Sequence, residues 1–173
     1  TYTTQTLAGS GTAAFADGSG VAANFNNPEG VAMDSHGNII VADRSNHKIR
    51  KISPDGVVTT IAGSTSGRVD GPALTAKFNS PWKVVVDKDD NIIVADRSNH
   101  CIRKISAAGI VSTIAGNGSS GTADGQGTAA RFNFPQDVDI DANGIIYVVD
   151  YTNDRIRKIT PDGTVSTLAG SST

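Results

Sequence analysis

The chain has 173 residues, which is long enough to bury a substantial core in a single domain. Its formal net charge of -2 excludes a general electrostatic attraction to nucleic acids or anionic membranes, and its single cysteine excludes an intrachain disulfide. No apolar run approaches the roughly 18 residues of a membrane helix, so we expect no membrane contact, and the sequence assigns the protein to no compartment.

The first nine residues match the end of three later repeats. They read TYTTQTLAG, and the repeats end in VVTTIAG, IVSTIAG and TVSTLAG. The matching glycines, Gly9, Gly63, Gly116 and Gly170, are 54, 53 and 54 residues apart. Such even spacing indicates repeated units. We therefore divide the chain into an extra outer strand, three blades that each include a lead-in insert, and a tail: 1–9, 10–63, 64–116, 117–170 and 171–173.

Each repeat contains four short strand candidates separated by turn signals. The first strand is predicted at 30–34, 84–87 and 138–141, and a tight turn follows it. Gly supplies the positive φ of this turn in two repeats, and Asp90 replaces it in the other. The second strand, NIIVAD or IIYVVD, is apolar and β-branched, which suits burial on both faces. The third is the HKIRKI-type stretch and the fourth the VVTTIA-type stretch.

The inserts between the repeats share a pattern. Each contains an Asp-Gly pair and then an Ala-rich lead-in to a phenylalanine: Asp17-Gly18 before Phe25, Asp70-Gly71 before Phe78, and Asp124-Gly125 before Phe132. We predict ordered crossover loops, with one helical turn, anchored by these phenylalanines. A calcium loop is the alternative, but one Asp among glycines falls well short of the 6–8 oxygens that Ca²⁺ takes. We therefore expect no metal and no cofactor.

No segment has a sustained helical period, so the chain is predicted to be all-β. Four short strands with apolar residues on both faces form a blade that packs against a neighbour on each side. Radial closure of such blades gives a β-propeller and protects the sheet edges. The predicted fold is therefore three propeller blades of four antiparallel strands each.

One constellation of polar residues recurs in every repeat. The pattern Asp-X-X-Asn-X-X-Ile-Arg follows an apolar strand and precedes Gly-X-Val-X-Thr-Ile-Ala-Gly. Its members are Asp43, Asn46, Arg50; Asp96, Asn99, Arg103; and Asp150, Asn153, Arg157. Through this pattern the chain resembles the NHL-repeat family. Because the pattern is repeated with the blade, we interpret it as structural: Asp and Asn hold the second turn, and Arg pairs with a carboxylate.

The resemblance implies a propeller that usually has six blades and acts mainly as a platform for proteins, RNA or other ligands. Three blades have too little circumference for that ring, so we expect two copies to close it as a homodimer. The alternatives are a fragment of a longer propeller, or an excised or reconstructed half without a native role alone. Two chains would carry eight fourth strands for six blades, so 1–9 is expected to be displaced or exchanged.

Basic and aromatic residues gather near the second turn of each repeat. The binding-face candidates are Arg44, His47, Arg97, His100, Tyr151 and Arg155, on loops 44–47, 97–100 and 151–154. Guanidinium and aromatic groups bind phosphates and stack on bases, so RNA is one possible partner. The acidic balance and the few aromatics favour protein instead. The simplest interpretation is a solvated face balanced by nearby aspartates.

A propeller enzyme or a small-ligand binder with a site in the central channel is the less favoured hypothesis, and we predict no catalytic residues. The resemblance extends to enzymatic propellers (sugar lactonases, strictosidine-synthase-like proteins and the peptide-amidating lyase domain), which would place a site in the central channel. The channel-facing candidates are Asp34, Asp87, Asp139 and Asp141, but three of these open a turn. No Ser-His-Asp order or Gly-rich phosphate loop is present. Cys101 replaces Lys48 and Arg155 of the other repeats, so we expect it to be partly exposed.

Overall fold

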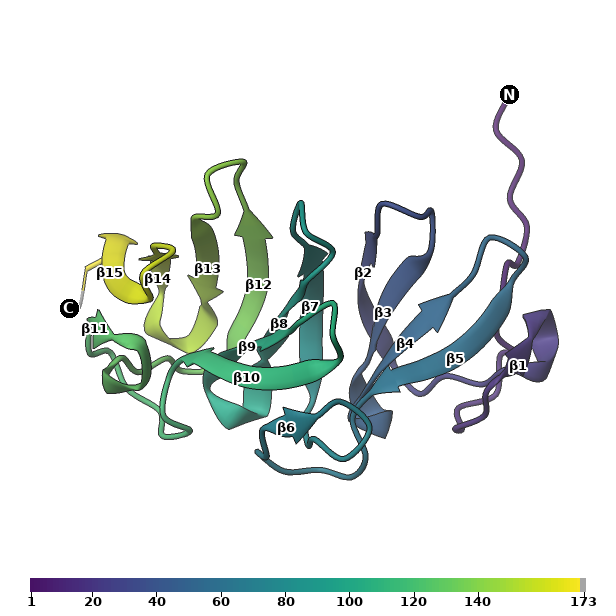
Figure 1. Ribbon diagram of the computed structural model, residues 1–173, viewed down its shortest axis with the longest axis horizontal. Coiled ribbons are helices and arrows are strands. Elements are labelled where there is room, and N and C mark those ends of the chain that lie inside the picture. The colour runs from purple at the N-terminus through teal and green to yellow at the C-terminus, as the bar shows by residue number, and fades with distance from the viewer. Residues whose placement is uncertain (172–173) are drawn as a thin grey trace.

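The computed structural model describes residues 1–171 and contains three five-stranded antiparallel sheets side by side (Figure 1). We call them blade 1, blade 2 and blade 3. Their strand orders are β1-β5-β4-β3-β2, β6-β10-β9-β8-β7 and β11-β15-β14-β13-β12. The all-β blade architecture is therefore confirmed.

The four long strands of each blade follow one another along the chain. In blade 1 they are β2 (Pro28–Met33), β3 (Ile39–Asp43), β4 (Lys48–Ile52) and β5 (Val57–Ala62). In blade 2 they are β7 (Pro81–Val86), β8 (Ile92–Asp96), β9 (Cys101–Ile105) and β10 (Ile110–Ala115). In blade 3 they are β12 (Pro135–Ile140), β13 (Ile146–Asp150), β14 (Arg155–Ile159) and β15 (Thr164–Ala169).

The fifth strand of each blade comes from the insert, where we predicted only a loop with a helical turn. These strands are β1 (Gly18–Ser19), β6 (Gly71–Pro72) and β11 (Gly125–Gln126), and each pairs with the outer long strand of the blade that follows. Single 3-10 turns accompany two of them, η1 (Gly20–Ala22) and η4 (Gly127–Ala129). A two-residue strand next to glycine shows no alternation of apolar residues, so the sequence pattern gave no sign of it.

The innermost strands start earlier than we predicted, at a proline in every blade. A register shift follows each of these prolines, for example between Pro81 and Lys83. A proline lacks the backbone donor of a ladder, and an edge strand with an irregular start tolerates it. The turns after these strands have the predicted positive φ, at Gly37, Asp90 and Gly144.

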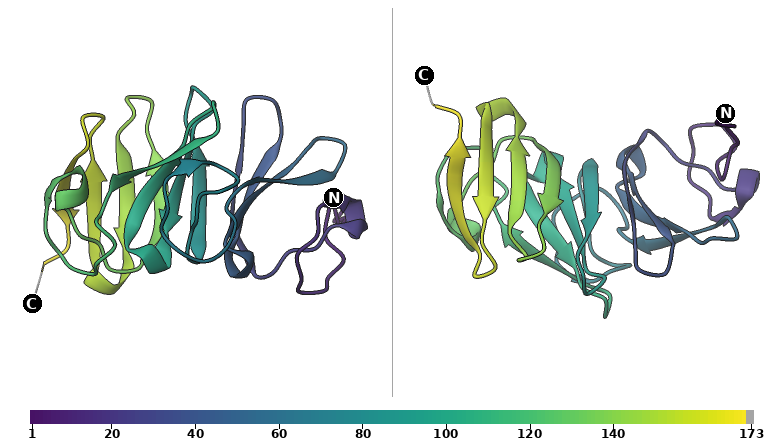
Figure 2. Two further views of the ribbon diagram at one scale, coloured as in Figure 1. Left: turned by 60° about the horizontal axis from the view of Figure 1, so that its bottom comes forward. Right: turned by 90° about the horizontal axis from the view of Figure 1, so that it is seen from above.

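The blades form an open row, with β2 next to β7 and β7 next to β12. Figures 1 and 2 show the N-terminus beside blade 1 and the C-terminus beside blade 3. Two apolar clusters fill the boundaries between blades. One joins blades 1 and 2 through Ile49 and Val84, and the other joins blades 2 and 3 through Ile102 and Val138. Most of the core therefore lies between blades.

The segment 1–9 forms no strand, although its last residue has the geometry of a strand end. The Gly9 N–H donates to the Gly20 carbonyl at 3.0 Å, as Gly63 donates to Ala73 at 2.9 Å. Residues 1–7 are exposed and extend from blade 1 (Figure 1). Gly9 is therefore positioned like the end of an outer strand of a blade that would precede blade 1. Residues 1–9 nevertheless belong to none of the three sheets. Of the predicted tail, 172 and 173 lie outside the described residues.

Among residues 1–171, no helix is long and apolar enough to cross a membrane.

Candidate functional site

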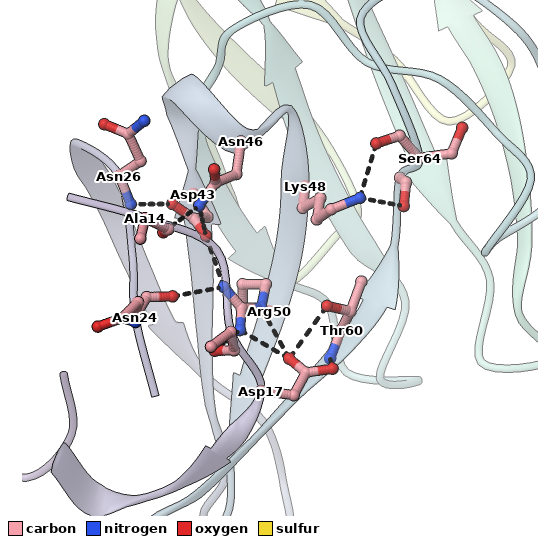
Figure 3. Close-up of polar contacts among 12 residues, drawn as sticks. Ala14, Asp17, Asn24, Asn26, Asp43, Asn46, Lys48, Arg50, Thr60 and Ser64 are labelled. Carbon is pink, nitrogen blue, oxygen red and sulfur yellow. Dashed lines mark hydrogen bonds and ion pairs between the residues drawn. The ribbon is translucent and has the colours of Figure 1, made fainter. Parts of the chain in front are cut away.

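A buried arginine lies at the centre of the repeated constellation in blade 1 (Figure 3). Arg50 Nη1 lies 2.6 Å from Asp43 Oδ2, and Nη2 lies 2.6 Å from Asp17 Oδ1 of the insert. Asp43 also accepts hydrogen bonds from the Asn46 side chain at 2.8 Å and from the Asn26 N–H at 2.8 Å. The arginine therefore joins the insert, the second turn and the third strand of its blade. We call this set the arginine clamp.

The arginine clamp is repeated in blades 2 and 3. Arg103 lies 2.8 Å from Asp96 and 2.6 Å from Asp70, and Arg157 lies 2.7 Å from Asp150 and 2.6 Å from Asp124. All three arginines are fully buried. The guanidinium carbon lies 5.1 Å from the ring centre of the insert phenylalanine in every blade, over Phe25, Phe78 and Phe132. The structure thus brings together each set of Asp, Asn and Arg that the sequence singled out.

Electrostatics bind the insert aspartates to their arginines. Burial opposes the charge on Asp17 and Asp124, but hydrogen bonds from the arginine and from Thr60 or Thr167 of the outer strand, together with the arginine charge, outweigh it and lower the pKa of both carboxyls. Full burial raises the pKa of Asp96 to about 6, so this carboxyl is still mostly ionised at pH 7. Each insert aspartate thus forms an ion pair with an arginine, which supports a structural role for these aspartates over a calcium loop.

The aspartates that we placed near the channel hold turns. Asp34 Oδ1 accepts the N–H groups of His36 and Asn38 at 3.0 and 2.8 Å. Asp87 and Asp141 do the same in their own turns, and Asp139 accepts the next N–H at 2.9 Å. Within residues 1–171, no three His, Cys, Asp or Glu side chains form a group that could hold a metal.

The second turns of the blades lie on one side of the row, and we call this side the turn face. It comprises η2 (Arg44–Asn46), η3 (Arg97–Asn99), η5 (Tyr151–Asn153) and the residue after each. Arg44 lies over the Trp82 ring at 5.0 Å, and Arg97 lies 4.7 Å from the ring centres of Trp82 and Phe134. Arginines and aromatic rings therefore alternate across both blade boundaries.

Two histidines of the turn face join neighbouring blades. His47 Nδ1 accepts the Ser80 N–H at 3.1 Å, and His100 Nδ1 accepts the Phe134 N–H at 3.1 Å. Burial, followed by the nearby charge of Lys48 or Arg97, lowers the pKa of both imidazoles. They are therefore neutral acceptors at pH 7, not cationic contacts for a ligand.

The remaining binding-face candidates lie at the end of the row. The Tyr151 side chain is exposed, and Arg155 Nη1 donates to the Thr122 carbonyl at 3.1 Å. Four of the six candidates thus link blades, whereas Tyr151 and Arg155 lie where blade 3 has no neighbour. The sequence reasoning missed Trp82 and Phe134. The Phe-Asn-X-Pro entry could have indicated them, because Phe134 is X of blade 3 and Trp82 follows Pro81.

The expectation for Cys101 was wrong. Its side chain is fully buried, and burial raises the pKa of its thiol. The longer Lys48 at the same place in blade 1 reaches the Ser64 carbonyl at 2.6 Å, whereas the shorter Cys101 side chain stays buried near Asp96 and Arg103 of its own blade.

A cavity of about 680 Å³ opens between blades 2 and 3 on the side of the first turns. Its lining includes isoleucines, among them Ile93, Ile114 and Ile140, and polar groups, among them Asp87, Lys88 and Lys104. This volume is in the range of small-molecule sites. At the boundary of blades 1 and 2, Ser35 Oγ instead donates to Asp90 Oδ2 at 2.6 Å and bridges the first turns.

A family model described as "NHL repeat" matches residues 25–52, 78–105 and 132–159. NHL repeat-containing protein 2 of Gallus gallus is 42% identical over 97 residues, which are 54% of this chain and 13% of that protein. The chain thus spans a small part of the curated relatives that it matches.

Solved structures share the fold. An auxiliary nutrient binding protein from Bacteroides thetaiotaomicron superposes with a TM-score of 0.67 at 25% identity, over 80% of this chain and 37% of that one. A gluconolactonase from Xanthomonas campestris gives 0.60 at 15% identity, over 83% and 47%. The first shares the repeat fold at low identity, and the second shows the fold alone.

Proposed function

The chain belongs to the NHL-repeat family, and from this premise we propose that it is a non-catalytic propeller scaffold. A second copy completes a six-bladed ring, and the ring presents its turn face to a protein partner. The observation that carries this proposal is that the two ends of the row expose side chains that both internal boundaries bury.

Blade 1 exposes one face of its sheet. In blades 2 and 3, the equivalent face packs against the preceding blade. Val31 is 57% exposed, whereas the equivalent Val84 and Val138 are 0% and 2% exposed. Met33 lies beside it on the same strand and is also exposed. An exposed apolar patch of this kind marks an interaction site.

Blade 3 exposes the opposite face. Ile156 is 36% exposed, whereas the equivalent Ile49 and Ile102 are fully buried against the next blade. Ala169 is exposed, and its equivalent Ala115 is buried. The two end faces are therefore the two halves of one boundary, and a second copy supplies each half to the other.

In the ring, segment 1–9 of one copy and β15 of the partner compete for the same outer-strand position, because both have the sequence of an outer strand. We expect β15 to occupy it. Val58, Val111 and Val165 are all buried at one position of that strand, and the equivalent residue of the segment is Thr4. Burying a hydroxyl in place of a methyl group is unfavourable. This difference favours β15.

Light scattering on a sizing column tests the assembly. We expect the mass of two chains, and we expect Val31→Asp to reduce it to one chain because a buried charge at the closing boundary is costly. Leu74→Asp is the matched control, since Leu74 is 62% exposed on the insert of blade 2, away from both ends. A wild-type protein with the mass of one chain would overturn the ring.

Protein binding is tested by comparing turn-face variants. Tyr151→Ala that keeps the solution mass of the wild type should abolish capture of the partner that the wild type binds, and Leu74→Ala should not. Retention of an RNA oligonucleotide that weakens steeply with salt would instead favour RNA.

The cavity between blades 2 and 3 favours a second candidate function, the binding of a small apolar ligand with a polar group. Its isoleucine lining supports this hypothesis. Fluorescence of an apolar dye should rise on binding, and Ile93→Asp should abolish the rise while Leu74→Asp leaves it. No rise with the wild type would exclude it.

A further inference from the structure

The internal boundaries share one hydrogen bond on the turn face. A histidine Nδ1 of one blade accepts a backbone N–H of the next, from His47 to Ser80 and from His100 to Phe134, at 3.1 Å in both cases. All four residues have positive φ, between 51° and 56°. The backbone therefore holds acceptor and donor in the same relative position at each boundary.

The positions of this acceptor and this donor also exist at the two ends of the row, but other residue types occupy them. Asp154 stands where the histidines stand, with φ 52° and ψ 39° against 51° and 39° for His100. Asn27 stands where Ser80 and Phe134 stand, with φ 50°. Among residues 1–171, nothing accepts the Asn27 N–H and nothing donates to the Asp154 carboxylate.

An aspartate can replace the histidine at this place without a longer reach. Nδ1 of histidine and Oδ1 of aspartate are both bonded to Cγ, so both bring an acceptor to the same distance from the backbone. A carboxylate accepts more strongly than a neutral imidazole because the hydrogen bond is charge-assisted. The end of the row thus carries a stronger acceptor than either internal boundary.

A hollow of about 240 Å³ lies beside Asp154 on the exposed face of blade 3. It is lined by Val149, Ile156, Ala169 and Gly170, among others. At the boundary of blades 1 and 2, the equivalent glycine is Gly63, and a Cβ there would lie 3.3 Å from the Phe78 ring. The equivalent phenylalanine of blade 1, Phe25, lies two residues before Asn27, and within one copy Gly9 lies against its ring, where a Cβ would be 3.3 Å away. Gly9 leaves this ring when segment 1–9 is displaced by β15 of the partner.

We propose that Asp154 of one copy accepts the Asn27 N–H of a second copy, while Phe25 of that copy enters the adjacent hollow. The contact occurs twice in the ring. This inference rests on the proposed assembly and adds its closing residues. The hydrogen bond needs only Asp154, which precedes both β14 and β15. The Phe25 contact also needs β15 in place, because Ala169 and Gly170 line the hollow.

A dilution series followed by light scattering tests the contact. Asp154→Ala should raise the dissociation constant at least tenfold, since a hydrogen bond to a charged group is worth about 1.5–3 kcal/mol. Asp154→His should stay within about threefold of the wild type, because it restores the internal pairing. Asp55→Ala is the matched control, an exposed aspartate in a turn of blade 1, and should change nothing.

The outcomes separate this inference from the assembly itself. A wild-type dimer whose dissociation constant is the same for Asp154→Ala as for Asp55→Ala would overturn the contact and leave the ring standing. A monomeric wild type would overturn both. We expect equal circular dichroism of all variants, which would show that the chain still folds, because among residues 1–171 the Asp154 carboxylate forms no hydrogen bond or ion pair.

Discussion

The arginine clamp and the turn face are both present in every blade, but they differ in how strictly they repeat. Every clamp has the same Asp, Asn, Arg and insert Asp, with distances that agree within 0.2 Å (2.6, 2.8 and 2.7 Å to the strand aspartate). The turn face changes from Arg44 and Arg97 to Tyr151, and from two histidines to Asp154. The clamp residues, which are identical, form contacts within their own blade. The turn-face residues, which differ, contact the neighbouring blade or lie where there is none.

The largest expected effect comes from the clamp of blade 2. Arg103→Ala leaves Asp96 buried without its counter-charge and should lower the free energy of unfolding by about 3–5 kcal/mol. Urea denaturation measures it. Lys88→Ala is the control, because Lys88 is exposed and, among residues 1–171, forms an ion pair with its neighbour Asp89 alone. A loss below about 1 kcal/mol would show that the clamp does not hold the blade.

A smaller effect is expected on the turn face. Arg97→Ala removes the guanidinium between Trp82 and Phe134 and should cost about 1–2 kcal/mol of unfolding free energy. Arg97→Lys should recover only part of it, since an ammonium does not stack on both rings. Full recovery by lysine would contradict the stacked arrangement.

The histidines of the boundaries predict a pH dependence. Their pKa is lowered in the folded state, so below pH 6.5 the unfolded chain binds more protons than the folded one. Stability should therefore be complete above pH 6.5 and decline as the pH falls toward the folded-state pKa. The raised pKa of Asp96 acts in the opposite direction between its unfolded value of 3.8 and about 6.

A double variant isolates the histidines. His47→Asn with His100→Asn keeps an acceptor on each Cγ but removes the titration, so its urea midpoint should fall less than that of the wild type between pH 7.5 and 5.5. An equal decline in both proteins would show that the histidines do not cause it.

The smallest effect is expected at the first turns. Ser35→Ala removes the hydroxyl hydrogen bond to Asp90 between blades 1 and 2, leaves the Ser35 N–H bonded to the same carboxylate, and should cost about 0.5–1 kcal/mol, as a single hydrogen bond does. Lys88→Ala, at the equivalent place between blades 2 and 3, should cost nothing, since Gly144 opposite has no side chain. Equal losses of unfolding free energy for Ser35→Ala and Lys88→Ala would show that the first turns do not bridge one boundary more strongly than the other.

The sequence periodicity predicted the strands, turns and contacts within one repeat, but it did not predict the contacts between residues of different repeats or inserts. The long strands, the turns at Asp90 and Gly144 and the meeting of Asp43 with Arg50 follow from local pattern. The strands β1, β6 and β11 lack such a pattern, because their two residues pair with a strand about 40 residues later. The stacking of Arg97 on Phe134 depends on the next blade, which a single repeat does not specify.

The central claim is that two copies close one ring, and the mass of the full chain in solution tests it most directly. Light scattering over a dilution series should give twice the chain mass of 17.8 kDa at every concentration above the dissociation constant. A folded protein that keeps the mass of a single chain at all concentrations, with Val31 and Ile156 still exposed, would contradict it.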